Sequence, residues 1–204
     1  MKDTRRKARE AQIEQAAYEV IEAKGYAGTS MLAVARRARA SNETLYNWYG
    51  DKQGLFRALV QRNAQEVTDH LAQAIAGSED PADAILVDVG ALLLGLVAGQ
   101  RAVALNRAAA ADPTGALGAL IAQGGRDTVA PMLGRLIAQV LRRSGPAQVD
   151  AAAATALFLD LLIGDLQIRR VIGQADMPDA DTRRARAIRA VRMMRLAVAE
   201  GLLS

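Results

Sequence analysis

Cysteine is absent from this 204-residue sequence, and histidine occurs only once, at His70. The lack of thiols excludes disulfide bonds, zinc–cysteine sites and thiol catalysis, and it permits a reducing compartment. Catalytic arrangements built on His or Cys have almost no members available, and Glu66 is the nearest side chain of metal-binding type to His70. The sequence therefore predicts a protein that is not an enzyme and that holds no metal and no cofactor.

Long hydrophobic runs are also missing. The longest apolar stretches, such as residues 89–99, are shorter than the roughly 18 residues that indicate a membrane span. The N-terminal stretch MKDTRRKAREAQ is charged and lacks the apolar core of a signal peptide. We therefore expect a soluble, cytoplasmic protein without a membrane partner.

The apolar residues recur at helical spacing, and no segment shows the alternation of a half-buried strand. Helices are expected, among others, over residues 4–24, 52–76, 115–123, 147–173 and 179–203, separated by Gly and Pro turns such as Gly124-Gly125. The expected fold class is all-α with about nine helices in total. Six of the seven aromatic residues lie at or before Phe56, and Tyr18, Tyr26 and Phe56 are expected to fill the core of a small N-terminal domain.

The positive charge is concentrated at the N-terminal end. Residues 1–60 contain eleven Lys and Arg against seven Asp and Glu, whereas the opposite charges cancel in the rest of the chain. Such a distribution is typical of a phosphate-binding module attached to a neutral one. The run Arg5, Arg6, Lys7 and Arg9 fits a basic solvated tail equally well.

Two short helices are expected close together, over residues 30–38 and 42–49. Thr29 or Ser30 can cap the first helix and Ser41 the second, with a turn of only a few residues around Arg39. The pattern is that of a helix-turn-helix. On the second helix one face is polar and the other apolar, and amide and carboxylate side chains on the polar face match the hydrogen-bonding pattern of base edges in the major groove.

Several short motifs resemble the DNA-binding domain of the TetR family of bacterial repressors. They are Gly25-Tyr26, Thr29-Ser30, Val34-Ala35, Thr44-Leu45-Tyr46, Lys52 and Leu55-Phe56. The family usually has glycine in the turn, where a positive φ is useful, and this chain has Arg39. Asn42-Glu43 also replaces the commoner Lys-Gly, a change that we expect to alter which operator is read. The C-terminal segment LFLDLLIGDLQIR is faintly similar to AefR-like members of the family.

The resemblance implies a three-helix DNA-binding domain over residues 1–51 and a larger helical domain for effector binding and dimerisation over residues 52–204. It implies that the partner is a double-stranded DNA operator with an inverted repeat. Backbone contacts are expected from Thr29, Ser30, Tyr46, Trp48 and Lys52. Asn42, Glu43 and Asn47 are the expected base-reading residues, and Thr44 is assigned to either role.

The resemblance also implies a homodimer formed by the helices at about 147–173 and 179–203. Both ranges carry apolar stripes that have to be buried against something. A twofold dimer would bury them and would present two reading helices to two half-sites. The alternative is that the stripes close the core of the single chain.

The last implied feature is a small effector, aliphatic or mixed in character, that releases the protein from its operator. Polar residues within apolar runs are the candidates for its contacts, namely Asn106, Arg107, Gln123, Asp160 and Asp165. Asp160 is also a candidate for pairing with an arginine across the dimer interface. Two other functions stay open: a constitutive DNA-binding regulator with no small-molecule ligand, and a helical enzyme dependent on Asp160 or His70.

Overall fold

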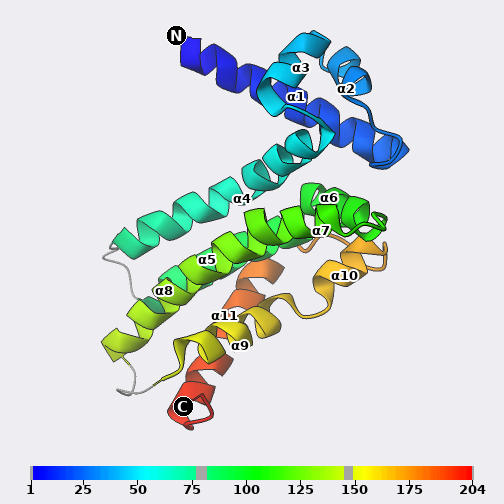
Figure 1. Cartoon of the computed structure of the whole chain (residues 1–204). Helices are drawn as coiled ribbons and strands as arrows, with labels where there is room; N and C mark the ends of the chain where they lie inside the picture. Colours follow the sequence, from blue (N-terminus) through cyan, green and yellow to red (C-terminus); the bar gives the residue numbers. More distant parts are fainter. Residues whose placement is uncertain (1, 77–81, 145–148, 204) are drawn as a thin grey trace. The chain divides into compact units, whose positions relative to one another are not determined.

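The computed structural model describes residues 2–76, 82–144 and 149–203, and within these ranges every regular element is helical (Figure 1). The elements are α1 (Lys2–Lys24), α2 (Met31–Arg37), α3 (Asn42–Tyr49), α4 (Lys52–Ala76), α5 (Ala82–Ala98), α6 (Gln100–Ala110), α7 (Ala116–Ile121), the π-helical turn η1 (Ala122–Arg126), α8 (Asp127–Ser144), α9 (Ala151–Ile163), α10 (Leu166–Val171) and α11 (Ala180–Ala199). The all-α fold class is confirmed.

Two helix boundaries differ from those expected. The range 147–173 splits into α9 and α10 because Gly164 adopts a φ of +50° at the end of α9, and the first residues of that range lie outside the described residues. The prediction of a turn between helices at Gly124-Gly125 is wrong: both residues lie inside η1, which continues directly into α8. The described residues contain eleven α-helical segments.

The chain packs into two compact units. The first consists of the residues up to Arg62 together with Ala104–Gly124, and the second consists of Asn63–Val103 with the residues from Gly125 onward. The expected boundary after residue 51 separates a DNA-binding domain from an effector-binding domain, and it stays a prediction. The packing units have other bounds: the start of α4 and the segment Ala104–Gly124, which contains α7, belong to the first unit.

The core of the first unit is built around the large N-terminal side chains. Phe56 and Tyr18 are buried, and the Tyr18 hydroxyl donates to the carbonyl of Leu59 at 3.2 Å. Tyr26 packs edge-on against Phe56 with ring centroids 5.4 Å apart. Other members come from several helices and include Ile13, Val34, Leu45, Leu105, Leu117 and Leu120. The three aromatic residues expected in the N-terminal core all take part, although Tyr26 is only half-buried.

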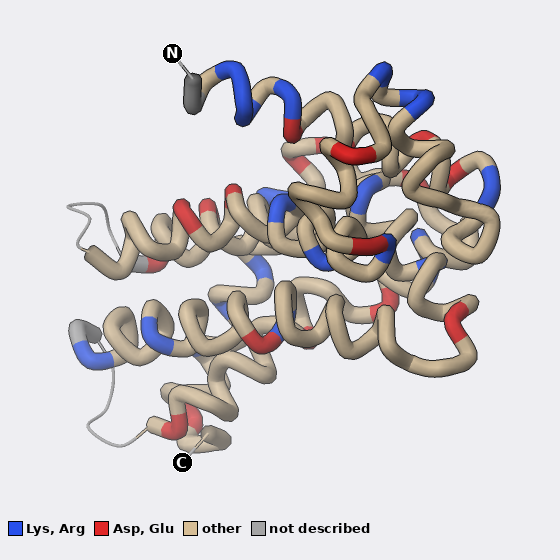
Figure 2. The backbone as a smooth tube through the Cα atoms, turned by 45° about the horizontal axis from the view of Figure 1, so that its top comes forward, with Lys and Arg blue, Asp and Glu red and all other residues tan. Residues whose placement is uncertain are grey.

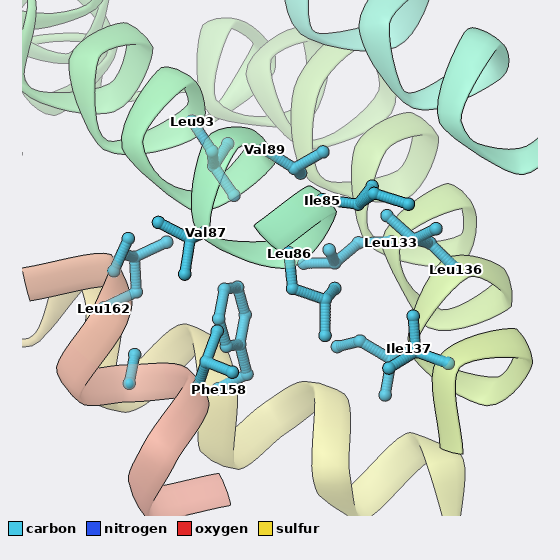
Figure 3. Close-up of a cluster of buried hydrophobic side chains, with 14 of the residues drawn as sticks. Ile85, Leu86, Val87, Val89, Leu93, Leu133, Leu136, Ile137, Phe158 and Leu162 are labelled. Carbon is cyan, nitrogen blue, oxygen red and sulfur yellow. The ribbon is translucent and has the colours of Figure 1, made fainter. Parts of the chain in front are cut away.

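The core of the second unit centres on Phe158 of α9, which is fully buried (Figure 3). Leu86 of α5 and Leu133 and Ile137 of α8 lie in the same cluster. Gly90 of α5 leaves room for the ring, since a Cβ there would come within 3.1 Å of Phe158 Cζ. This close approach explains why α5, an almost wholly apolar helix, carries a glycine at that position.

One described segment, Ala151–Val171, is long and apolar enough to cross a membrane by length and composition alone. This differs from the expectation that no apolar stretch reaches that length. The core helix of a soluble protein, which is mostly buried, passes the same test. Phe158 and Leu162 of this segment are fully buried in the second unit, but most of the segment is not buried within the single chain. A single segment of this kind is weak evidence for a membrane span.

Candidate nucleic-acid interface

Both helices of the helix-turn-helix begin at the serine caps expected from the sequence. The Ser30 hydroxyl accepts a hydrogen bond from the backbone N–H of Ala33 at 3.2 Å, and the Ser41 hydroxyl accepts from that of Thr44 at 3.0 Å. Each bond satisfies an N–H that has no partner within its own helix. The start of α3 is thus determined by local chemistry.

The turn between them adopts the left-handed conformation that the family usually gives to glycine. Arg39 has a φ of +52° and is exposed. A side chain in this region crowds the following carbonyl, so the conformation has to be held by other contacts. The turn expected from the sequence is therefore present, with arginine at its strained position.

One face of α3 is polar and open to solvent. Asn42, Glu43, Tyr46 and Asn47 are exposed, and 51% of the Tyr46 surface is accessible. Leu45, on the opposite face, is fully buried in the core of the first unit. This separation leaves two amides, a carboxylate and a phenol hydroxyl free to meet an external partner.

The predicted backbone-contact residues at the edges of this face are held by their neighbours. The Arg6 guanidinium lies over the Trp48 ring at 5.4 Å, and Lys52 Nζ lies 4.1 Å from the centre of the Tyr26 ring. Lys52 Nζ also donates to the carbonyl of Ala27 at 3.4 Å, and its partial burial lowers the pKa of the ammonium group. Arg6 and Lys52 thus each place a cationic group beside α3.

The two threonines are already engaged within the protein. Thr29 is buried, and its hydroxyl donates to the carbonyl of Gly25 at 2.8 Å. The Thr44 hydroxyl lies 2.7 Å from that of Ser41. Of the two residues expected at the start of α2, Ser30 is exposed and available to a partner, whereas the Thr29 side chain is committed to its own loop.

The basic run at the N-terminus lies on a helix. Arg5, Arg6, Lys7 and Arg9 belong to α1, which begins at Lys2, and Figure 2 shows basic residues along the first turns of this helix. The backbone of these four residues is therefore helical and is not an irregular solvated tail. They add positive charge to the unit that carries α3.

An ion-pair cluster that the sequence did not reveal joins α1 to α4. Arg62 Nε lies 3.2 Å from a Glu14 carboxylate oxygen, and Arg62 Nη2 lies 3.5 Å from one of Glu10. Glu14 is 8% exposed, and a carboxylate so far from solvent is stabilised by pairing with a cation. Glu10 and Glu14 are four residues apart on one helix face, but nothing local to them points to an arginine 48 residues away.

The Tyr49 hydroxyl beside this cluster gives a first prediction. It is enclosed without a hydrogen-bond partner among the described residues, and burial, together with Glu14 and Glu10, raises the pKa of this phenol well above its ordinary value. We expect Tyr49→Phe to leave the free energy of unfolding unchanged or to raise it by up to about 1 kcal/mol in urea unfolding, because an unpaired buried hydroxyl costs stability.

Tyr18→Phe is the matched control for Tyr49→Phe. It removes a buried hydroxyl that is hydrogen-bonded to Leu59, and it should cost about 1 kcal/mol. A larger loss for Tyr49→Phe than for Tyr18→Phe would show that the Tyr49 hydroxyl has a partner in solution.

The five expected effector contacts are divided between the two units. Asn106, Arg107 and Gln123 belong to the first unit, whereas Asp160 and Asp165 belong to the second and are exposed. Arg107 and Gln123 are exposed as well. Their assignment as ligand contacts stays a prediction. Among the described residues, no group of three or more His, Cys, Asp and Glu side chains could hold a metal ion.

Comparisons with known proteins agree with this geometry. Residues 13–59, which run from the middle of α1 through α2 and α3 into α4, match the family model described as bacterial regulatory proteins, tetR family. No curated protein sequence matches the chain. The solved structures that resemble it cover nearly its whole length.

Three of these structures illustrate the degree of similarity in sequence identity, TM-score and coverage. A TetR-family transcriptional regulator from Mesorhizobium loti is 21% identical with a TM-score of 0.73, over 92% of this chain and 95% of that one. A TetR transcriptional regulator from Agrobacterium tumefaciens is 28% identical with a TM-score of 0.68, over 91% and 92%. The regulator FadR from Bacillus subtilis, solved with stearoyl-CoA, is 15% identical with a TM-score of 0.70, over 91% and 97%. Residues 13–59 thus match the TetR-family N-terminal domain, on a chain whose fold is that of solved TetR-family regulators.

Proposed function

We propose that this protein is a sequence-specific DNA-binding transcriptional regulator, a repressor that a small effector releases from its operator. The observation that carries the proposal is the exposed polar face of α3, capped by Ser41 and set within a TetR-family N-terminal domain. The lack of a nucleophile–base pair in the sequence argues against the enzyme alternative, and the family consists of regulators. A cytoplasmic location follows from this role.

The contacts are divided between positioning and reading. Asn42, Glu43 and Asn47 read base edges, because Asn pairs bidentately with adenine and Glu accepts a hydrogen bond from cytosine. The backbone contacts are assigned to Ser30, Tyr46, Trp48 and Lys52, with Thr44 in either role and Thr29 the weakest member of the set. The exposure of Asn42, Glu43 and Asn47 leaves them open to base edges, as this assignment requires.

The homodimer proposed for helices at about 147–173 and 179–203 is supported by apolar side chains left open on the second unit. Ile168 and Ile172 of the α10 region are 58% and 60% exposed, and Met193 and Leu196 of α11 are 47% and 56% exposed. Exposed apolar side chains of this size on both predicted interface segments are surface that a partner could cover. A twofold partner would cover these residues and place two copies of α3 over an inverted repeat.

The effector is proposed to be mainly apolar. In the second unit the buried side chains are almost all aliphatic, and the one buried polar side chain among the described residues, Thr155, already donates to the carbonyl of Ala151 at 2.6 Å. The Bacillus subtilis relative is described in complex with stearoyl-CoA, a ligand with a long aliphatic chain. The AefR-like character of the C-terminal segment stays a proposal of the same kind.

Effector binding can be coupled to operator binding through helices that continue from one unit into the other. Two continuous helices, α4 and α6, each contribute residues to both compact units. An effector that binds better to the DNA-incompetent state, with a coupling free energy of about 1 to 3 kcal/mol, would lower operator affinity by roughly 5- to 150-fold. We assign to α4 the role of main mechanical link.

Substitutions in α3 and at the start of α4 should separate reading from positioning. Asn47→Ala should relax the preference at one base-pair position, at a cost of about 1 to 3 kcal/mol for the preferred base. Lys52→Ala should weaken binding to all sequences alike, and it should reduce the slope of log affinity against log salt concentration by about one unit. Competition binding with operator variants and a salt series measures both effects.

Lys52→Arg serves as the control for this pair, because it keeps the charge and should keep the salt slope. Equal loss of sequence preference in Asn47→Ala and Lys52→Ala would contradict the proposed division of roles.

The experiment that tests the function as a whole is binding of the purified protein to the DNA immediately upstream of its own gene. The assay is repeated with stearoyl-CoA, free fatty acids and a mixed small-molecule panel. A sequence-specific shift that one compound reverses supports a ligand-gated repressor. Specific binding that no compound disturbs supports the alternative, a constitutive regulator, and the absence of specific binding at any salt concentration would contradict the proposed function.

A further inference from the structure

The turn between α2 and α3 places a bulky residue in a conformation that favours glycine. Arg39, at φ +52°, is the one non-glycine residue with a positive φ among the residues described. Its N–H donates to the carbonyl of Arg36 at 3.2 Å, and the N–H of Ala40 donates to that of Ala35 at 2.9 Å. These two bonds define a Schellman motif, in which the left-handed residue is usually glycine because a Cβ is disfavoured there.

Arg9 of α1 supplies the contacts that hold this turn. Its Nη1 donates to the carbonyl of Ala38 at 3.2 Å, and its Nη2 donates to the carbonyl of Arg39 at 2.5 Å. Nη1 also donates to Gln12 Oε1 at 2.9 Å, which orients the guanidinium along α1. The planar fork of arginine suits two neighbouring carbonyls, and the C-terminal end of a helix favours a cation.

The turn determines where the reading helix starts. Ser41, the cap of α3, follows Arg39 by two residues, and Asn42 and Glu43 come directly after it. A change in the Arg39 backbone would rotate the first turn of α3 relative to α2, and with it the side chains that meet the bases. Whatever stabilises the left-handed conformation therefore also orients the reading side chains.

We propose that Arg9 is a positioning residue for DNA recognition: it holds Arg39 in the left-handed conformation and so replaces the glycine usual at this turn. The effect on DNA recognition rests on the function proposed above, whereas the effect on the turn does not. The contact joins residues 30 positions apart, which is why the local pattern around the turn gives no sign of it.

The turn itself is tested with four proteins: wild type, Arg9→Ala, Arg39→Gly and the double variant. The readout is hydrogen exchange of the Ala40 amide, which is bonded across the turn to Ala35. Arg9→Ala should speed this exchange about fivefold or more, because the strained residue loses its support. In the Arg39→Gly background the same substitution should change it little, because glycine adopts the conformation unaided.

Recognition is tested with the affinity ratio between operator and random duplex. Arg9→Ala should lower this ratio by about fivefold to tenfold, and Arg39→Gly should restore it in the double variant although a second charge is lost. A direct phosphate contact by Arg9 would instead weaken both duplexes alike, reduce the salt slope by about one unit and resist rescue. Arg5→Ala, an exposed charge on the same helix, is the matched control and should leave the ratio unchanged.

The outcomes for the two proposals are separable. Unchanged Ala40 exchange in Arg9→Ala, or an equal change in both Arg39 backgrounds, overturns the role of Arg9 whatever the DNA result. A wild-type protein that prefers no duplex would overturn the proposed function, while the exchange cycle would still decide whether Arg9 holds the turn. In a further outcome, Arg39→Gly rescues the exchange of the Ala40 amide, but the affinity ratio between operator and random duplex is the same in all four proteins. Arg9 would then only stabilise the fold, and its positioning role would be overturned.

Discussion

Replacing Leu196 by glutamate should leave each subunit folded but dissociate the proposed dimer. Leu196 is 56% exposed within the single chain, so a carboxylate there meets solvent and costs the subunit little. In a twofold interface built on α11, the same carboxylate would be buried without a partner, which is strongly unfavourable. We expect a monomer in analytical ultracentrifugation at concentrations where the wild type is a dimer.

The same substitution should reduce operator binding far more than any single DNA-contact variant. A dimer engages its second half-site as an intramolecular event, so loss of the dimer should lower the apparent affinity by about 100-fold or more. Leu32→Glu, which places the same charge on an exposed leucine of α2, is the control for the oligomeric state and should remain dimeric. A Leu196→Glu protein that stays dimeric would place the interface elsewhere on the chain.

Local chemistry made the helix-turn-helix predictable. The caps at Ser30 and Ser41, the buried Leu45 and the polar face of α3 each depend on residues within a few positions of one another. A positive φ at Arg39 could be expected because neighbouring motifs align with a family that has glycine there. For features of this range, sequence spacing is a sufficient guide.

Features that depend on distant residues could not be predicted in the same way. The pairing of Arg62 with Glu14 and the donation from Arg9 to the Arg39 carbonyl each join separate helices, and their partners carry no distinctive pattern. Gly124-Gly125 was misjudged because two glycines indicate a break, whereas here they sit in a π-helical turn, where a Cβ on Gly124 would come within 2.8 Å of Val60.

The stability of the second unit should depend on Phe158 more than on any other side chain in its core. Phe158 is fully buried, and it is the one aromatic residue after Phe56. Phe158→Ala would leave a void bounded by Gly90, which has no side chain to fill it, so the site cannot collapse easily. We expect a loss of about 3 to 5 kcal/mol in the free energy of unfolding, measured by urea denaturation.

Phe158→Leu is the matched control for this variant, because it keeps much of the volume and should cost less than about 2 kcal/mol. The proposed dimer face belongs to the second unit, so operator binding by Phe158→Ala should fall in proportion to the unfolded fraction. An apolar compound that restores both stability and binding would occupy the void itself, since a ligand that binds only the folded state stabilises it. A loss below about 1 kcal/mol would instead mean that α5, α9 and α11 close around the missing ring, and that this core is more adaptable than its packing indicates.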